Sequence, residues 1–214
     1  MEELMSSHTD KPRPGWAVDH EFTEAIKRSE NDPALEALPP YQRPTIRPGD
    51  PLRFSINTVA EPTSWQGKRG YLISPMPGWS GYEIFCDEGT VIGGTDLAPS
   101  PLGYLTSAIA FCMLTHITGY LARNPLEIKR IKVEMRGEFW SSLGVAGDGG
   151  QGEGGCDAFT CAVIIDSDEP EEKIARLTEV CRKACMAFET VAKAVPTSTT
   201  LVLNGESHTI GAGQ

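Results

Sequence analysis

The sequence predicts an α+β fold, because its strands and helices fall in separate runs instead of alternating one by one. Strand-like patterns dominate residues 52–92, and a long apolar helix is expected from residue 101 to about residue 124. Two strands, a second long helix and a closing strand follow it. Segregated runs of this kind are typical of α+β folds and not of repeating βα units. A length of 214 residues suits one domain or at most two small ones.

The first 50 residues are expected to form a Pro-rich N-terminal arm on a single domain that spans residues 51–214. Prolines interrupt regular structure there, so only one short helix, at residues 22–29, is expected. The prolines are Pro12, Pro14, Pro33, Pro39, Pro40, Pro44 and Pro48. We expect an ordered arm and not a low-complexity tail, because several apolar side chains can anchor it in a groove. These are Trp16, Phe22, Ile26 and Tyr41.

Within the main domain, alternation of apolar and polar residues predicts several strands. The early pattern consists of Leu52, Phe54 and Ile56, then Tyr71 and Ile73, Tyr82 and Ile84, and finally Val91 and Ile92. Residues 128–140 predict a half-buried strand, since every second side chain in their centre is apolar. Further strands are expected at residues 159–165 and 197–203, and the last one ends at Asn204-Gly205.

Two helices are predicted by end signals and by apolar residues at helical spacing. Ser100 suits an N-cap, Pro101 suits the first helical position and Pro125 ends the first helix. This helix is apolar nearly all round, which is typical of a buried helix. The second begins near residues 169–172, with acids in the first turn where the macrodipole favours them. Its apolar stripe is Ile174, Leu177, Val180, Cys181, Ala184, Phe188 and Val191.

Charge and composition exclude several classes of function. The chain carries 19 Lys and Arg against 29 Asp and Glu, which gives a net charge of −10. An acidic chain gains no counterion-release affinity for nucleic acid and no attraction to anionic lipid, so neither nucleic acid nor a membrane is an expected partner. No uninterrupted apolar stretch is long enough to span a bilayer, and the N-terminus lacks the features of a secretory signal. With six cysteines, these features favour a cytoplasmic protein with reduced thiols.

Two local patterns suggest cofactor or metal sites but lack the context that such sites need. Residues 147–152 match the spacing of a dinucleotide-binding turn, yet a strand follows them where a helix N-terminus is required. A hairpin loop is expected instead. Cys156 and Cys161 are five residues apart and fall on opposite faces of a regular strand, so they do not suit a zinc site. We therefore expect no cofactor and no metal.

Cys112 is the candidate nucleophile, and two interpretations fit its position. It lies about eleven residues beyond the start of the first helix, too far for the macrodipole to favour a thiolate. His116, one turn further along the same face, could hydrogen-bond the sulfur, but from the residues alone a core cysteine beside a structural histidine is the stronger interpretation. Cys181 and Cys185 share a face of the second helix. They are too far apart to bridge within an undistorted helix, but either could meet a thiol from another element.

The segment that leads into the first helix has a specific pattern. It reads Asp87-Glu88-Gly89, then Gly93-Gly94-Thr95-Asp96, then Ala98-Pro99-Ser100-Pro101-Leu102. This pattern resembles the OsmC/Ohr family of thiol-dependent peroxidases, which reduce organic hydroperoxides, and their many relatives of unknown activity. The resemblance covers residues 82–203 and implies that Cys112 is the peroxidatic cysteine. It implies that Cys185, ten residues before Val195-Pro196, is the resolving cysteine, with Cys181 as the alternative.

The same resemblance implies an architecture and partners. The expected fold has two long central helices packed against antiparallel β-sheets, in an intertwined homodimer. The cysteine pair is expected in an apolar pocket between two subunits, with an apolar organic hydroperoxide as substrate and an external thiol as reductant. A dimer also agrees with the composition, because two long apolar helices and a few short strands would leave a large exposed patch on one chain.

The sequence departs from the family pattern at three points. Gly103 stands where peroxidase members carry a Glu that orients an Arg onto the thiolate. The Arg itself has only Arg69 and Arg53 as candidates, and His116 is the possible substitute for the missing acid. The usual Cys-Pro of the second helix is Cys185-Met186, so this helix need not bend as the family's does.

These departures keep other functions open. The leading hypothesis is an antioxidant oxidoreductase, a Cys-based hydroperoxide reductase with redox-active Cys112 and Cys185. The alternative is a non-catalytic relative that binds a small apolar ligand at the dimer interface, which the loss of the Glu at Gly103 favours. A third hypothesis, a partner-binding protein that acts through residues 1–48, rests only on the Pro-rich composition of that segment.

Overall fold

The computed structural model describes residues 18, 23–30, 33–74, 78–142 and 153–213. The chain forms two compact units. The first comprises residues 1–101 and 199–211, and the second comprises residues 102–198 and 212–214. Of the side chains expected to anchor the N-terminal arm, Trp16 and Phe22 lie outside the described residues, and Ile26 and Tyr41 are exposed.

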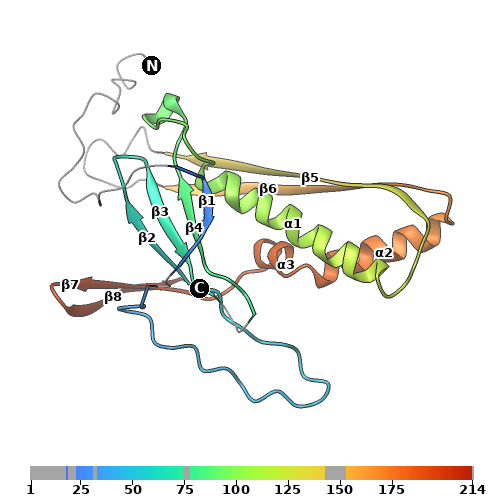
Figure 1. Ribbon diagram of the computed structural model, residues 1–214, viewed down its shortest axis with the longest axis horizontal. Helices are drawn as coiled ribbons and strands as arrows, with labels where there is room; N and C mark the ends of the chain where they lie inside the picture. The colour runs from blue at the N-terminus through green and yellow to red at the C-terminus, as the bar shows by residue number, and fades with distance from the viewer. Residues whose placement is uncertain (1–17, 19–22, 31–32, 75–77, 143–152, 214) are drawn as a thin grey trace. The chain divides into compact units, whose positions relative to one another are not determined.

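An antiparallel four-stranded sheet in the order β1-β4-β3-β2 forms the centre of the first unit (Figure 1). Its strands are β1 (Ile26–Arg28), β2 (Thr58–Pro62), β3 (Lys68–Leu72) and β4 (Tyr82–Cys86). The helix expected at residues 22–29 is therefore wrong, because residues 26–28 pair with β4, Ile26 opposite Ile84. So short a helix cannot satisfy its own backbone groups, whereas the edge of β4 offers them partners.

Two further strand predictions in this unit are wrong. Leu52, Phe54 and Ile56 alternate with polar residues but precede β2, which begins at Thr58. They lie beside no strand that could pair with them within the described residues, and alternation alone does not make a strand. Val91 and Ile92 belong to a 3₁₀ turn, η3 (Thr90–Ile92), which ends at Gly93 with a φ of +86°.

Asp87, immediately after β4, organises the segment between β4 and the first helix. Its buried carboxylate accepts hydrogen bonds from the backbone amides of Glu88 (2.8 Å) and Thr95 (2.9 Å) and from the Thr95 hydroxyl (2.5 Å). A longer one comes from the amide of Leu97 (3.3 Å). Burial opposes ionisation, but these hydrogen bonds outweigh it and lower the pKa of Asp87. The Gly-Gly-Thr-Asp segment of the sequence is thus a loop built around one carboxylate.

Helices and a long β-ribbon form the second unit (Figure 1). Its elements are α1 (Pro101–Leu121), β5 (Ile128–Ser141), β6 (Gly154–Ser167), α2 (Glu171–Ala184) and α3 (Met186–Ala192). The core consists of Met113 and Ile117 from α1, Leu177 and Cys181 from α2, and Cys185. Apolar residues of the ribbon pack against this core, among them Val133 on β5 and Val163 on β6. One face of the ribbon therefore covers both helices.

The α1 helix begins at Pro101 as predicted, but it is not buried all round. Ile109, Met113 and Ile117 are buried, whereas the opposite face is open and Phe111 is 67% exposed. The reason is that β5, β6 and α2 cover only one side of the helix in this chain. By length and composition α1 could also cross a membrane, a property that core helices of soluble proteins share.

The β5–β6 ribbon is longer than the two strands that the sequence predicts, and a bulge changes one of its faces. Phe139 pairs with Cys156 and Glu138 with Ala158, so Asp157 is the extra residue. The bulge places Cys156 on the same face as Cys161, contrary to the expectation of opposite faces. Their partners on β5, Phe139 and Met135, are four residues apart, or about 13 Å, which is too far for one ion. The glycine-rich segment 147–152 lies between the two strands and outside the described residues.

The helical segment is interrupted at Cys185, between α2 and α3, although no proline follows this residue. Cys185 has φ −69° and ψ 101°, an extended conformation that ends α2 and starts α3. The expectation of one continuous helix with an apolar stripe from Ile174 to Val191 is therefore wrong, because α2 ends at Ala184 and α3 begins at Met186. A salt bridge of 3.5 Å between Arg182 on α2 and Glu189 on α3 spans the break and stabilises it.

A hairpin of β7 (Thr197–Leu203) and β8 (Glu206–Gly213) ends the described chain. The strand at residues 197–203 is confirmed, but β8 is an addition that the sequence analysis misses. Asn204 (φ 53°) and Gly205 (φ 87°) make the turn, and an Asn-Gly pair between two strands is the usual signal for such a hairpin. From the sequence, Asn204-Gly205 is interpreted only as the end of a strand and not as the turn of a hairpin.

Candidate functional site

The structure brings Cys112 and Cys185 together in the second unit. Cys112 projects from the middle of α1 and is half buried, whereas Cys185 lies at the break between α2 and α3 and is fully buried. Their side chains are hydrogen-bonded to each other, and both sulfurs are free thiols. Two cysteines 73 positions apart in the sequence are thus neighbours because α1 and α2 pack on the same ribbon.

Burial sets the protonation state of Cys185. It raises the pKa of the Cys185 thiol to about 11, the backbone amides of Phe188 and Ala187 oppose the rise, and the hydrogen bond to Cys112 adds to it. At neutral pH Cys185 therefore keeps its proton beside the sulfur of Cys112.

The surroundings of the pair are apolar and rich in sulfur. Met113, Leu177 and Phe188 pack in the same cluster as Cys112 and Cys185. The cluster includes or touches two further thiols, Cys181 on α2 and Cys161 on β6, and burial raises the pKa of both. Cys181 is one helical turn before Cys185, so the chain keeps two buried thiols near Cys112.

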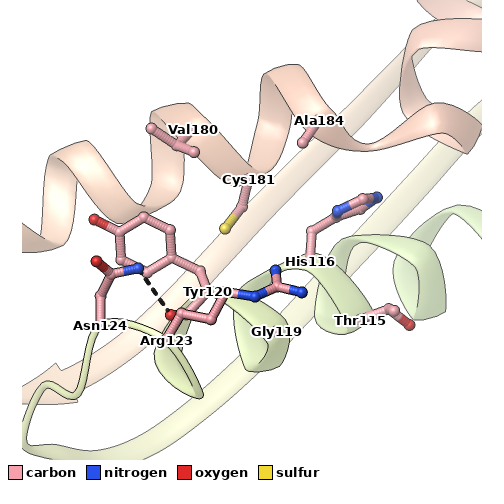
Figure 2. Close-up of a pocket in the computed structure, with 9 residues that line it drawn as sticks. All are labelled: Thr115, His116, Gly119, Tyr120, Arg123, Asn124, Val180, Cys181 and Ala184. Atoms are coloured by element: carbon pink, nitrogen blue, oxygen red, sulfur yellow. Dashed lines mark hydrogen bonds between the residues drawn. The ribbon is translucent and has the colours of Figure 1, made fainter. Parts of the chain in front are cut away.

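His116 lies one turn after Cys112 on α1, as the spacing predicts, and the structure places it in a pocket with Cys181. Figure 2 shows the His116 imidazole extending from α1 toward α2, with the Cys181 sulfur pointing into the same pocket. Tyr120, Arg123 and Asn124 add further polar groups to its lining. These three residues are not among the sequence-predicted site residues, although positions 116, 120 and 123 share one face of a helix and could have indicated them.

The two candidate arginines lie in the first unit. Arg69 on β3 pairs with Glu61 on β2 at 2.8 Å, and its guanidinium lies over the ring of Tyr71 at 5.1 Å. Its buried Nε has no hydrogen-bond partner within the described residues. Arg53 is exposed in the irregular segment before β2. The role of either residue toward Cys112 remains a prediction.

The first turn of α1 lacks the acid that the family pattern puts there. Gly103 is the third residue of the helix and no acidic residue lies in this turn. Among the described residues, no group of three His, Cys, Asp or Glu side chains is arranged to hold a metal ion. The reactive groups that the site presents are the thiols of Cys112 and Cys185.

A sequence model of the OsmC-like protein family matches residues 94–200, which is half of the chain. The chain belongs to the OsmC-like family. The match runs from the loop built around Asp87, through α1, the ribbon and α2, into β7. The expected α+β fold of this family, with long helices against antiparallel strands, is confirmed. None of the curated proteins compared with the chain matches it.

Several solved structures are similar to this chain of the OsmC-like family. An OsmC-like hydroperoxide resistance protein from Jannaschia sp. CCS1 is 20% identical with a TM-score of 0.47, covering 67% of this chain and 89% of that one. An OsmC-like protein from Mycoplasma pneumoniae is 18% identical with a TM-score of 0.48, covering 66% and 88%. An organic hydroperoxide resistance protein from Legionella pneumophila is 10% identical with a TM-score of 0.42, covering 66% and 91%.

Proposed function

We propose that this OsmC-like protein is a thiol peroxidase that reduces small apolar organic hydroperoxides, with Cys112 as the peroxidatic and Cys185 as the resolving cysteine. The observation that carries the proposal is the hydrogen-bonded contact between these two free thiols in an apolar cluster. A dithiol that can close to a disulfide without large movement is the requirement of two-cysteine peroxide chemistry. The apolar surroundings favour an alkyl or aryl hydroperoxide over hydrogen peroxide.

The proposed reaction has three steps. The Cys112 thiolate attacks the terminal oxygen of the hydroperoxide, the O–O bond breaks, and the alkoxide leaves as the alcohol after it takes up a proton. The sulfur of Cys185 then attacks the Cys112 sulfenic acid, and the hydroxyl group leaves with the Cys185 proton as water. An external dithiol supplies two electrons and two protons to reopen the disulfide by thiol–disulfide exchange.

Burial gives the two cysteines different roles. Cys185 retains its proton at neutral pH, because its pKa is about 11. A thiol that keeps its proton is a poor nucleophile. Cys112, which is the less buried of the two, is therefore the sulfur that meets the peroxide.

The absence of an acid near Gly103 favours a second candidate function, a non-catalytic protein that binds a small apolar molecule. In the family pattern the Glu at this position orients an arginine onto the thiolate, and no acidic residue lies in the first turn of α1 here. This candidate predicts ligand binding without consumption of thiols. Peroxide turnover separates the two candidates directly.

We propose that the protein is a cytoplasmic homodimer. The support is the exposed apolar side chains of each unit, which are Leu102, Leu105 and Phe111 on α1 in one unit and Leu203 and Ile210 on the terminal hairpin in the other. Exposed apolar area of this extent on one chain is typical of a surface that a partner covers. Sedimentation velocity measures the assembly, and a monomer at micromolar concentration would contradict it.

The test of the enzymatic function is single-turnover reduction of cumene hydroperoxide by the fully reduced protein. We expect wild type to consume one peroxide per chain and to lose two thiols, with a Cys112–Cys185 disulfide identified by mass spectrometry. Cys112→Ser should consume none. The matched control is Cys156→Ser, because Cys156 is exposed near the end of the ribbon and should be dispensable. Equal, negligible rates in wild type and Cys112→Ser would exclude the peroxidase.

A further inference from the structure

A second feature of the helical unit is the pocket between α1 and α2, with a volume of about 370 Å³ (Figure 2). It lies one turn away from the cysteine pair on each helix, since His116 follows Cys112 on α1 and Cys181 precedes Cys185 on α2. Its wall on α2 is formed by Val180, Cys181 and Ala184 and is apolar. The proposed peroxidase reaction uses none of the residues that line this pocket.

The opposite wall, on α1, presents cationic and hydrogen-bonding groups. His116, Tyr120 and Arg123 follow one another at helical spacing, and Figure 2 shows the Arg123 guanidinium folded back along α1 toward His116. Asn124 is held beside them by a hydrogen bond of 3.2 Å from its side-chain amide to the Tyr120 carbonyl. Arg123 is the one formally charged residue that lines the pocket, and none of the lining residues is acidic, although the chain has a net charge of −10.

The Arg123 guanidinium is available for a ligand. Within the described residues it makes no ion pair, whereas Arg182 on the neighbouring helix is paired with Glu189. Guanidinium presents two parallel N–H donors that match the two oxygens of a carboxylate. A cationic wall facing an apolar wall therefore suits a molecule with a carboxylate at one end and an apolar body at the other.

Gly119 gives the pocket its depth. It lies in the interior of α1, where glycine costs about 1 kcal/mol relative to alanine. Apart from the backbone of its own helix, a Cβ at Gly119 would meet no atom within 4 Å, so packing among the described residues does not require a glycine. Because the space beside Gly119 is the pocket itself, the glycine keeps open a volume that any larger residue would fill.

From these observations we propose that the pocket is a binding site for a small monocarboxylate with an apolar body. Arg123 binds the carboxylate, His116 and Tyr120 lie beside it, and the apolar body rests over Gly119 against Val180 and Cys181. The proposal does not depend on redox activity of Cys112. In this site the buried thiol of Cys181 is part of the apolar wall and not a nucleophile.

Binding of 2-naphthoate to the full-length protein tests the proposal, with the neutral isostere 2-naphthamide as the comparison. Isothermal titration should give a Kd of about 1 mM or tighter for the acid and binding at least tenfold weaker for the amide. Arg123→Gln should reduce binding of the acid to that of the amide. Gly119→Leu, which fills the pocket and touches no cation, should abolish binding of both. Arg176→Gln makes the same change in charge at an exposed position of α2 outside the pocket and should leave binding unchanged.

Three results would overturn the proposal. The first is the absence of saturable binding of 2-naphthoate to wild type, and the second is equal binding of the acid and the amide. The third is unchanged binding in both Arg123→Gln and Gly119→Leu, which would place the ligand elsewhere. If wild type fails to bind and Gly119→Leu alters the sedimentation coefficient, the pocket is instead occupied by a second copy of the chain. Since peroxide turnover is measured separately, failure of this proposal is distinguishable from failure of the peroxidase.

Discussion

Cys185, at the break between α2 and α3, lies against Cys112 of α1 in one apolar cluster. Cys185 is fully buried and keeps its proton up to a pKa of about 11. The chemistry of this cysteine pair therefore depends on which of the two thiols loses its proton first and on how the other thiol then reacts.

The high pKa of Cys185 predicts the pH dependence of disulfide formation. The thiolate is the attacking species, so the fraction of reactive Cys185 rises about tenfold per pH unit below its pKa of about 11. We expect the rate of conversion of the Cys112 sulfenic acid to disulfide to rise throughout pH 7 to 10. Stopped-flow mixing followed by acid quench and mass spectrometry measures it. A rate that is independent of pH over this range would show that Cys185 is not the attacking thiol.

A comparison of Cys185→Ser with Cys181→Ser identifies the resolving residue. Both positions are buried, so the two substitutions cost similar stability, on the order of 1–2 kcal/mol for a buried hydroxyl. Cys185 interacts directly with Cys112, so Cys185→Ser should slow disulfide formation by at least 100-fold and let the sulfenic acid accumulate. Cys181→Ser should change the rate by less than about threefold. The reverse result would transfer the resolving role to Cys181.

Patterns with several independent signals predicted their elements well. The α1 helix begins at Pro101 because the proline needs no hydrogen-bond partner there, and the long strand β5 follows its alternation of apolar residues. The predictions for short segments were wrong, because the secondary structure of Ile26 depends on pairing with Ile84, which is 58 positions away. Leu52 and Ile56 alternate correctly but are exposed, because no neighbouring strand accepts them.

The candidate site was likewise predicted only in part from the sequence. The cysteine pair was expected from the resemblance, but the break at Cys185 was not, since no local residue such as proline marks it. The pocket of His116 and Arg123 depends on how α1 packs against α2, which a linear sequence does not show. Buried Asp87 was missed as an organising residue because an acid after a strand more often lies in solvent.

Asp87 predicts a loss of stability in acid. Its pKa is lowered in the folded state, so its contribution is complete above the unfolded value near pH 4 and is lost as the pH falls through the lower folded value. Asp87→Asn should lower the free energy of unfolding by about 2 kcal/mol at pH 7, because an amide cannot accept all four hydrogen bonds. Urea unfolding at pH 7 and pH 3 measures the effect, which should shrink at pH 3. Asp168→Asn, at an exposed salt bridge with Lys129, is the control and should cost less than about 0.5 kcal/mol. Equal effects of the two substitutions would show that the buried carboxylate does not stabilise the loop.

We expect Gly94→Ala and Gly119→Ala to have opposite effects on the stability of the protein. A Cβ on Gly94 would lie 1.7 Å from the backbone oxygen of Glu88, so the loop would have to open. Gly94→Ala should therefore destabilise the protein by about 3 kcal/mol. Gly119→Ala meets open space in the interior of α1 and should stabilise it by up to about 1 kcal/mol, since alanine is the better helix former. Thermal unfolding of both variants beside wild type measures the difference. If Gly119→Ala also destabilised, the space beside Gly119 would have to be filled in the assembled protein, and the α1 face would be a packing surface and not a ligand pocket.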